Sequence, residues 1–316
     1  MALAFARSPQ QLLIFGEFYL DLVFYDLLDV PRLGEEVKTR SFAELPGGGL
    51  ATTALVAAGL GTLTAVVTRI GQDARLSPAW QRLVKSKVSV EACESSSQLP
   101  TARTVCASYN GDRMMITHDA INENLRSLLD LPKVRTQLRA SKHVHLACAL
   151  WPIRAWLPAI RRLRSQGLTL SADIGWNPEM FQSRELPRLL EELEFTFPNE
   201  MEARAMTQER SIESALKKIA RSVRVPVIKL GEGGSIAFQN GRIVRAKSIR
   251  VRSIDATGAG DAFNGGFLHG YLAGWDLEEC LRAGNVCGAL ATTAAGGSSA
   301  IPTQRQLKRL MKTTAH

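Results

Sequence analysis

The chain has 316 residues, of which 45% are hydrophobic, 22% charged and 6% aromatic, and its 39 basic and 30 acidic side chains leave a formal net charge of +9. This composition is typical of a globular protein and excludes collagen-like, disordered and disulfide-scaffold classes. The length allows one large α/β domain or two smaller ones. No stretch approaches the roughly 20 apolar residues that a membrane helix needs, so we expect no membrane partner.

The cysteines and the basic charges narrow the class further. The five cysteines are odd in number and form no CxxC pair, so the sequence indicates neither a zinc site nor a disulfide framework. A reducing cytoplasm fits this usage best. The basic excess would suit nucleic acid or a small phosphorylated substrate. Because the positive charges are scattered along the chain, we expect no nucleic-acid partner.

The first quarter of the chain predicts a βαβ unit. A strand at 12–18 is followed by a Gly-opened helix at 49–60 and by a second strand at 63–70. Ser77 then precedes a proline, a pair that suits the N-cap and first turn of a helix at 78–85.

Two segments depart from this α/β rhythm. Residues 17–45 form a polar-interrupted extended stretch. Strands at 104–109 and 113–117 flank Asn110-Gly111, a dipeptide suited to the positive φ angles of a tight hairpin turn. We assign residues 17–45 and 100–118 to a small β-sheet that stands off the main sheet and forms a lid.

The second half of the chain alternates between strands and helices. Strands are predicted at 144–149, 168–174, 195–198 and 225–230, and helices at 153–165, 185–193 and 212–222. This alternation predicts a largely parallel sheet covered on both faces. A second hairpin is expected at Asn240-Gly241, followed by helices at 260–273 and 277–294. No linker or internal repeat is evident between these segments.

The strongest local signal is the run IDATGAGDAF at residues 254–263, a Gly-rich turn that opens a long apolar helix. Gly258 and Gly260 let the backbone approach a ligand, and the free amides and dipole of the helix start favour an anion. The Asp261 carboxylate would repel a phosphate, but it suits a general base that deprotonates a hydroxyl attacking that phosphate. The alternative is an acidic first-turn residue that only complements the helix dipole.

Two common nucleotide motifs are absent. The chain has no GxxxxGK[ST] sequence, and Gly16-Glu17-Phe18 rather than GxGxxG follows the first predicted strand. A second Gly-rich turn, Gly231-Glu232-Gly233-Gly234, also fits a plain connection between a strand and a hairpin.

Four segments together resemble the pfkB family of ribokinase-like carbohydrate kinases. They are the C-terminal signature at 255–261, the N-terminal signature at 46–61, the NxxE element at 199–202 and the nucleotide-loop strand at 229–234. The segments come in the order of the family and span roughly residues 12 to 303. The resemblance implies a single three-layer α/β domain over residues 1–316, with a largely parallel central sheet and a small β-sheet lid.

The resemblance also implies a reaction. The chain is expected to be an ATP-dependent phosphotransferase that phosphorylates a hydroxymethyl group of a small sugar or sugar derivative. By that resemblance Asp261 is the base, and Gly258, Ala259 and Gly260 build the anion hole with the Asp261 amide.

Further roles follow only from the resemblance. On the nucleotide side they fall to Asn199, Lys229, Gly231, Gly234 and Asn285, with Asn285 beside the adenine. Glu202 would organise Mg²⁺ through water, with Asn199, and Asp255 would belong to a K⁺ site. On the acceptor side the matching residues are Asp21, Gly47, Gly48 and Thr52. From the residues alone, Asp21 reads as a polar residue on an exposed strand.

Three positions depart from the family pattern. Thr52 stands where many members have Asn, which bears on the orientation of the sugar. Ala256 replaces a frequent Thr and weakens the argument for a K⁺ site. Lys229 replaces a small hydroxyl residue, and either reaches a nucleotide phosphate or is a solvated strand end.

Other functions remain open at this level. A nucleoside kinase of the same fold would use the same chemistry, and a non-catalytic protein of this fold would bind nucleotide or sugar as a regulatory module. The acceptor itself is open among sugars, keto-deoxy acids, sugar phosphates and nucleosides. The lid hairpin offers a strand edge through which two chains could form a homodimer.

Several polar residues are weighed separately. His143 and His145 are interpreted as a buried strand pair rather than a metal site. Asp173, near Trp176 and Asn177, follows a predicted strand, at the end of a sheet where α/β proteins place ligands. Two lid arginines are interpreted as exposed strand residues, the alternative being a site for a phosphorylated acceptor; they are Arg103 and Arg113.

Overall fold

The computed structural model describes residues 11–109 and 112–313, and its centre is an eight-stranded sheet. The strand order is β14-β13-β12-β11-β10-β9-β1-β4. Within this sheet, β4, β1, β9, β10, β11 and β12 run parallel to one another. The strands β13 and β14 add an antiparallel hairpin at one edge. Their bounds are β1 (Gln11–Gly16), β4 (Thr64–Val67), β9 (Ser141–Ala147), β10 (Thr169–Ala172), β11 (Phe195–Thr196), β12 (Val225–Lys229), β13 (Ser235–Gln239) and β14 (Arg242–Ala246).

Alternation along β1 explains why helices cover both faces of the sheet. Leu13 and Phe15 belong to one hydrophobic cluster, whereas Leu12 and Ile14 belong to another on the opposite face. Successive side chains of a strand point to opposite faces, so a strand that is apolar at every position needs a layer of helices on each side.

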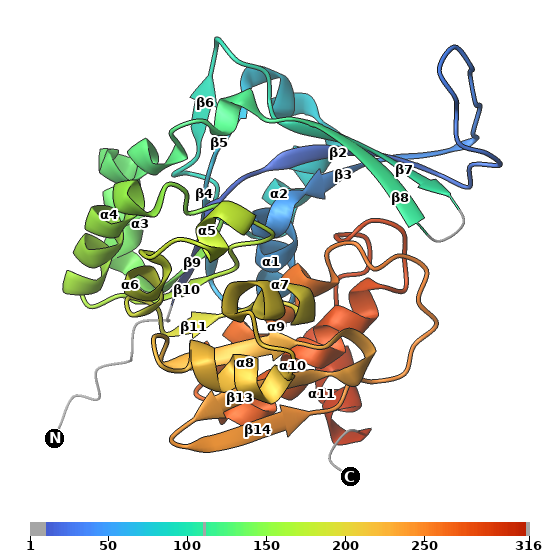
Figure 1. Ribbon diagram of the computed structural model, residues 1–316. Coiled ribbons are helices and arrows are strands. Elements are labelled where there is room, and N and C mark those ends of the chain that lie inside the picture. The colour runs from blue at the N-terminus through green and yellow to red at the C-terminus, as the bar shows by residue number, and fades with distance from the viewer. Residues whose placement is uncertain (1–10, 110–111, 314–316) are drawn as a thin grey trace, which may run out of the picture.

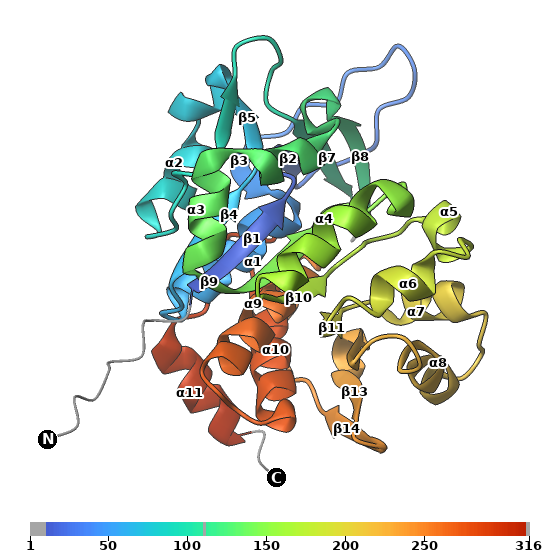
Figure 2. The same ribbon diagram turned by 90° about the vertical axis from the view of Figure 1, so that its left-hand side faces the viewer.

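The helices form these two outer layers. The first layer contains α3 (Pro132–Ala140), α4 (Ile153–Ser165), α5 (Pro178–Phe181), α6 (Leu186–Leu190), α7 (Glu200–Thr207) and α8 (Ile212–Ile219). The second contains α1 (Gly48–Gly59), α2 (Pro78–Lys85), α9 (Ala259–Leu272) and α10 (Leu277–Ala291), with α11 (Gln304–Thr313) packed on α10. Figure 2 shows α3 and α4 on the near side of the sheet and α1 beyond it.

A second, four-stranded sheet stands off this body with the order β3-β2-β7-β8. It is built from β2 (Tyr19–Tyr25), β3 (Ser41–Gly47), β7 (Arg103–Tyr109) and β8 (Asp112–His118). In Figure 1 it projects from the upper part of the molecule. The predicted three-layer domain with a β-sheet lid is therefore confirmed, while the turn at Asn110-Gly111 lies outside the described residues.

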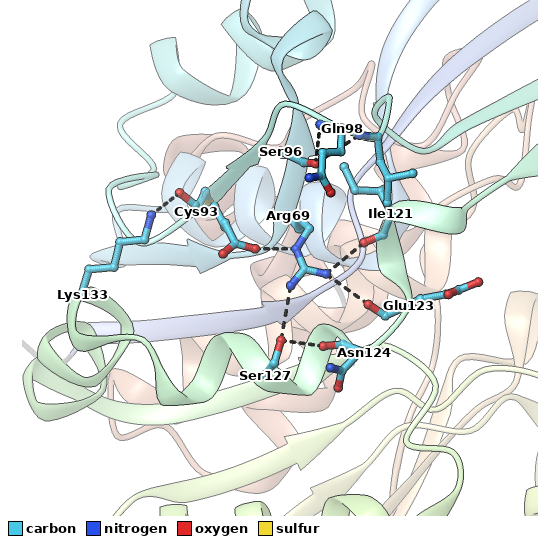
Figure 3. A network of polar contacts seen from close by, with 11 residues as sticks. Arg69, Cys93, Ser96, Gln98, Ile121, Glu123, Asn124, Ser127 and Lys133 are labelled. Atoms are coloured by element: carbon cyan, nitrogen blue, oxygen red, sulfur yellow. Dashed lines mark hydrogen bonds and ion pairs between the residues drawn. The ribbon is translucent and has the colours of Figure 1, made fainter.

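A polar network around Arg69 fixes the root of the lid (Figure 3). Arg69 pairs with Glu94 and donates to the carbonyl oxygens of Ile121 and Glu123, at 3.4 and 3.1 Å, and to Ser127 Oγ at 3.3 Å. The carbonyl groups lie in the segment that returns from β8 to the main body. The guanidinium group thus offers several donors in a fixed plane, which suits this role.

One predicted strand is wrong in its extent. The single strand expected at 63–70 is two strands, because the chain leaves the main sheet after Val67 and forms β5 (Arg69–Gly71), which pairs with β6 (Glu94–Ser96) in a separate two-stranded sheet. The ion pair between Arg69 and Glu94 joins these two strands. Short 3₁₀ helices complete the chain at η1 (Gln72–Leu76), η2 (Ala120–Asn122), η3 (Leu125–Asp130) and η4 (Gly231–Gly233).

Other boundaries differ in smaller ways. The first predicted strand ends at Gly16, where a Cβ atom would overlap the carbonyl oxygen of Ala147, and the chain then turns into the lid. The helices α3, α5, α7 and α11 were not predicted. The second hairpin is confirmed, since Asn240 and Gly241 have φ angles of 51° and 78°. Over the described residues, every helix is too short or too polar to cross a bilayer.

Candidate active site

The site lies where parallel strands of the main sheet end. Glu17 follows β1, Asp173 follows β10, Asn199 comes shortly after β11, and Lys229 closes β12. The carboxyl ends of parallel strands meet at one edge of a sheet, which is where α/β proteins bind ligands.

The start of α9 forms the centre of the site. Gly258 is its N-cap residue, with a φ angle of +69° that favours glycine, and a Cβ atom there would lie 2.6 Å from Gly297 Cα. The Ala259 amide donates to the Ala256 carbonyl oxygen at 3.3 Å. The next amides, of Gly260 and Asp261, belong to the first turn, where no residue four positions earlier in the helix can accept them. Gly260 and Asp261 therefore place their amides at the predicted anion site, whereas the Ala259 amide is bonded within the turn.

The Asp261 carboxylate faces the start of α1. A Cβ atom built on Gly49 would lie 2.9 Å from Asp261 Oδ1, and Thr53 Oγ1 donates to the Asp261 carbonyl oxygen at 3.1 Å. Burial raises the pKa of Asp261 to about 7, and the nearby Asp173 carboxylate adds to this effect. Such a pKa suits a general base that works near neutral pH.

The acceptor side forms around the turn between β3 and α1. A Cβ atom at Gly47 would overlap the Asp21 carboxylate, so only glycine allows Asp21 to lie against this turn. Gly48 has a φ angle of +82°. Burial raises the pKa of Asp21 to about 6. Asp21 is half-buried against this turn, so its interpretation as a polar residue on an exposed strand is wrong. Thr52 is buried in α1, with 3% of its surface exposed.

Sequence reasoning missed a second acidic residue beside this turn. Tyr19 Oη donates to Glu17 Oε2 at 2.8 Å, and the Glu17 carbonyl oxygen lies 2.5 Å from a Cβ atom built at Gly48. Burial raises the pKa of Glu17. The side-chain polar atoms of Asn122 are buried near them, next to Tyr19. The available signal was the acidic residue directly after the first strand.

A cavity of about 890 Å³ opens on the other side of the α9 start. It is lined by the Gly-rich turn after β12, the β14–α9 connection and α10, including Gly231, Gly234, Gly260 and Asn285. Asn285 Nδ2 donates to the carbonyl oxygens of Ala246 and Lys247, at 2.9 and 3.3 Å, and so joins α10 to the end of β14. At Gly234 a Cβ atom would overlap the Ala246 carbonyl oxygen.

Lys229 lies between this cavity and the α9 start. Its Nζ donates to Asp173 Oδ2 at 2.7 Å, and its side chain is 13% exposed, so the interpretation as a solvated strand end is wrong. A Cβ atom built on Gly260 would lie 3.0 Å from this Nζ. Asn264 Nδ2 also donates to Asp173 Oδ2, at 2.7 Å. Asp173 therefore lies in the site, as its place after a strand indicated.

The residues of the NxxE element cap α7. Asn199 Oδ1 accepts from the Glu202 amide at 2.9 Å, and Glu202 Oε2 accepts from the Asn199 amide at 2.8 Å. Burial raises the pKa of Glu202. The described residues contain no cluster of three or more His, Cys, Asp or Glu that could hold a metal alone. One carboxylate of this kind fits Mg²⁺ that keeps its waters and binds with nucleotide phosphates.

Asp255 joins two loops around the α9 start. Its Oδ1 accepts from the amide and hydroxyl of Thr257, at 2.8 and 2.6 Å, and its Oδ2 accepts from the Gly296 amide at 2.8 Å. This position is next to Gly258 and Gly297, which contact each other directly. Asp255 therefore supports the turn that carries the anion site.

The other candidates that the structure describes lie outside the reacting centre. His143 and His145 are buried, and both bind Ser171 Oγ at 2.8 Å, as a strand pair would. Arg103 pairs with Asp73 at the root of the lid. The side chain of Arg113 lies outside the described residues, and Trp176 packs edge-on against Phe181.

Comparison with known proteins agrees with this geometry. The family model described as pfkB family carbohydrate kinase matches residues 9–304. A cytidine kinase of Thermococcus kodakarensis is 30% identical over 248 residues, covering 76% of this chain and 85% of that protein. A ribokinase of Lactococcus lactis is 24% identical over 300 residues, covering 95% and 96%.

Among solved structures, a putative ribokinase II of Escherichia coli in complex with ATP and Mg²⁺ is similar, with a TM-score of 0.82, 21% identity and coverage of 96% of this chain and 99% of that chain. This likeness shows the fold. The family match extends over nearly the whole sequence and includes all four motif segments. The chain therefore belongs to the pfkB family of carbohydrate kinases.

Proposed function

We propose that this ATP-dependent carbohydrate kinase transfers the γ-phosphoryl group of ATP to a hydroxymethyl group of a small, uncharged sugar or nucleoside. The observation that carries the proposal is the position of Asp261. Its carboxylate lies between the acceptor turn at Gly49 and the anion site at the start of α9, and its pKa of about 7 suits proton abstraction.

The reaction is a single displacement. Asp261 takes the proton of the acceptor hydroxyl as its oxygen forms a bond to the γ-phosphorus. The bond from that phosphorus to the β,γ-bridging oxygen breaks, and its electron pair leaves with ADP. The first-turn amides of α9 donate to the oxygens of the transferred group, which stabilises the charge in transit.

The nucleotide would occupy the cavity beside α10. Gly231 and Gly234 line this cavity, and the open space at Gly231 suits phosphates that approach the backbone. The cavity wall at Asn285 suits the adenine. Mg²⁺ would neutralise phosphate charge there, with Asn199 and Glu202 holding its water shell. The Escherichia coli relative crystallised with ATP and Mg²⁺ supports this assignment. We assign K⁺ to the two loops that Asp255 joins, at Thr257 and Gly296. A comparison of turnover in K⁺ and in Na⁺ tests this assignment.

The charge of the acceptor side favours a neutral acceptor. Glu17 and Asp21 are both acidic, and neither has a cationic partner among the described residues. A carboxylate offers two oxygens to adjacent hydroxyls, which suits a sugar diol. Sugar phosphates and keto-deoxy acids would meet like charges at this turn, so we rank them below free sugars and nucleosides.

A nucleoside acceptor is the second candidate within the same chemistry. The similarity to a cytidine kinase supports it, as a ribose hydroxymethyl group presents the same nucleophile. A purely regulatory binding protein is less well supported, because it has no need of a base at Asp261.

The five free cysteines fit action in a reducing cytoplasm.

The deciding experiment is ADP release from ATP and Mg²⁺ across a panel of acceptors. The panel pairs each neutral compound with an anionic relative, such as ribose with ribose 1-phosphate, and includes cytidine and adenosine. We expect the highest kcat/KM on one neutral acceptor. Faster turnover of the anionic partner would overturn the acceptor class, and binding of ATP without turnover on any compound would favour the regulatory alternative.

A further inference from the structure

We propose that Lys229 is a catalytic residue that contacts the transferred phosphoryl group, and that Asp173 and Asn264 are positioning residues that hold its ammonium group at the α9 start. The inference rests on the proposed function. It assigns a role to a position at which this chain departs from the family pattern, and to two residues that no motif includes.

The backbone of Lys229 is fixed on both sides. Its amide donates to the Pro198 carbonyl oxygen at 2.9 Å, and it forms an isolated bridge with Asn199, the N-cap of α7. The side chain then runs under the α9 start, where the ammonium group lies beside Gly260. Its position is therefore set by the fold rather than by a flexible loop.

Asp173 anchors the ammonium group through one oxygen. Its Oδ2 accepts hydrogen bonds from Lys229 Nζ and Asn264 Nδ2, both at 2.7 Å. Asn264 is fully buried in the second turn of α9, and the Asp173 amide donates to the Leu146 carbonyl oxygen at 3.0 Å. Asn264 thus ties the ion pair to the same helix that carries Asp261.

The ammonium group and the start of α9 line the same cavity. The Lys229 ammonium group lies beside Gly260 in the first turn of the helix, and the start of a helix carries roughly half a positive charge. An anion between the ammonium group and the helix amides would be stabilised by both. The arrangement therefore points to a phosphate-type ligand at this place.

The surrounding carboxylates explain why a phosphate bound at this place would need a cation. Asp173, Asp261 and Glu202 all interact electrostatically with Lys229. Three carboxylates against one ammonium group leave an acidic surrounding that would reject a phosphate without a cation of its own. Among the described residues that line the cavity, Lys247 and Arg250 are exposed, whereas the Lys229 side chain is mostly buried.

Lys229 would act without gaining or losing a proton. Its ammonium group donates to an oxygen of the transferred phosphoryl as the bond to the acceptor oxygen forms and the bond to the β,γ-bridging oxygen breaks. Charge held in a site shielded from water acts more strongly than in bulk solvent. The proton of the acceptor still goes to Asp261.

The test compares Lys229→Met with Lys217→Met, a control on the exposed surface of α8. Removing one preorganised donor to a transition-state oxygen lowers kcat roughly 100- to 1000-fold, and we expect the acceptor KM to change less than about threefold. Lys229→Arg should recover part of the rate because it keeps the charge. Asp173→Asn should lower kcat roughly 10- to 100-fold through misplacement.

The pH profile separates this role from a structural one. Asp173, Glu202 and Asp21 raise the pKa of Asp261 and Lys229 lowers it, while burial raises it most. The acid limb of kcat/KM should therefore shift to higher pH in Lys229→Met and to lower pH in Asp173→Asn. Shifts in the same direction, or no shift, would contradict the proposal.

A double variant distinguishes a loss of catalysis from a loss of folding. Lys229→Met leaves the Asp173 charge without its partner, which can unfold the protein. The double variant Asp173→Asn/Lys229→Met removes both charges, so it should keep a wild-type melting transition and still lose the rate. Wild-type turnover in the folded double variant would overturn the role of Lys229. If the wild-type protein itself turned over no acceptor, the proposed function would fail first.

Discussion

At the scale of single residues, the Asp261 carboxylate that serves catalysis also lowers the stability of the folded protein. The group is placed among Asp173, Glu202 and Asp21, and burial with these charges raises its pKa to about 7. Ionised carboxylates that share a site disfavour each other, so the charged form needed for catalysis is the less stable one in the folded protein. Activity and stability should therefore respond in opposite directions when this carboxylate is removed.

Asp261→Asn should lower kcat by roughly two to four decades, because the acceptor hydroxyl loses its base. The measurement is ADP release on the best acceptor of the panel, with Asp130→Asn on the protein surface as the matched control. A variant that keeps full turnover would remove Asp261 from the role of base.

The same variant should melt at a higher temperature than the wild type at pH 8. The pKa of Asp261 is raised on folding, so the folded protein binds the proton more tightly than the unfolded chain, and this contribution to stability is lost as the pH rises through about 7. The gain should shrink below about pH 4, where both states are protonated. Melting curves across this range check the sign, and a lower melting temperature at pH 8 would contradict it.

At the scale of elements, the start of α9 was predictable and the ion pair beneath it was not. The Gly-rich turn, the first residues of the helix and Asp261 lie within the ten residues 254–263, so local chemistry defines them. Lys229 and Asp173 are 56 residues apart, and only the order of strands brings β10 and β12 to the same edge. Glu17 was missed for a related reason, since its neighbours come from the lid and from α1.

Strand boundaries follow the same division. Alternating or continuous apolar runs identified most strands of the main sheet. The split of residues 64–71 into β4 and β5 depends on a partner strand, β6, more than 20 residues later, which no local pattern reveals. The short polar helix α7 is defined by its capping box, whereas the sequence motif at 199–202 indicated a ligand site instead of a helix start.

Gly258→Ala tests whether the α9 start depends on its geometry. The φ angle of +69° costs alanine about 1 kcal/mol, and the Cβ atom would also press on Gly297 Cα at 2.6 Å. Gly274→Ala is the control, as its φ angle is +80° with nothing within 4 Å. We expect both variants to lose stability, Gly258→Ala to lose more, and only Gly258→Ala to lose turnover, by at least about tenfold. Equal turnover in the two variants would contradict the assigned anion site.

At the scale of the whole molecule, the lid carries both a site residue and an exposed apolar face. Asp21 lies on β2, on the face of the lid that meets Gly47. On the opposite face, Val105 and Ile116 are paired across β7 and β8, and they are 37% and 75% exposed. Met114 extends this face at 45% exposure. An apolar sheet face next to an open strand edge is typical of an interface.

We expect this face to join two copies of the chain, with β8 at the contact. Ile116→Lys would place a charge in the centre of that face and should convert a dimer into a monomer, as measured by light scattering after size-exclusion chromatography. Leu76→Lys, on η1 and 91% exposed, is the matched control and should leave the dimer intact. Because the dimer would hold the two lids in place, the monomeric variant should also show a higher acceptor KM. A wild-type protein that is monomeric at every concentration, or an Ile116→Lys variant that stays dimeric, would contradict this arrangement.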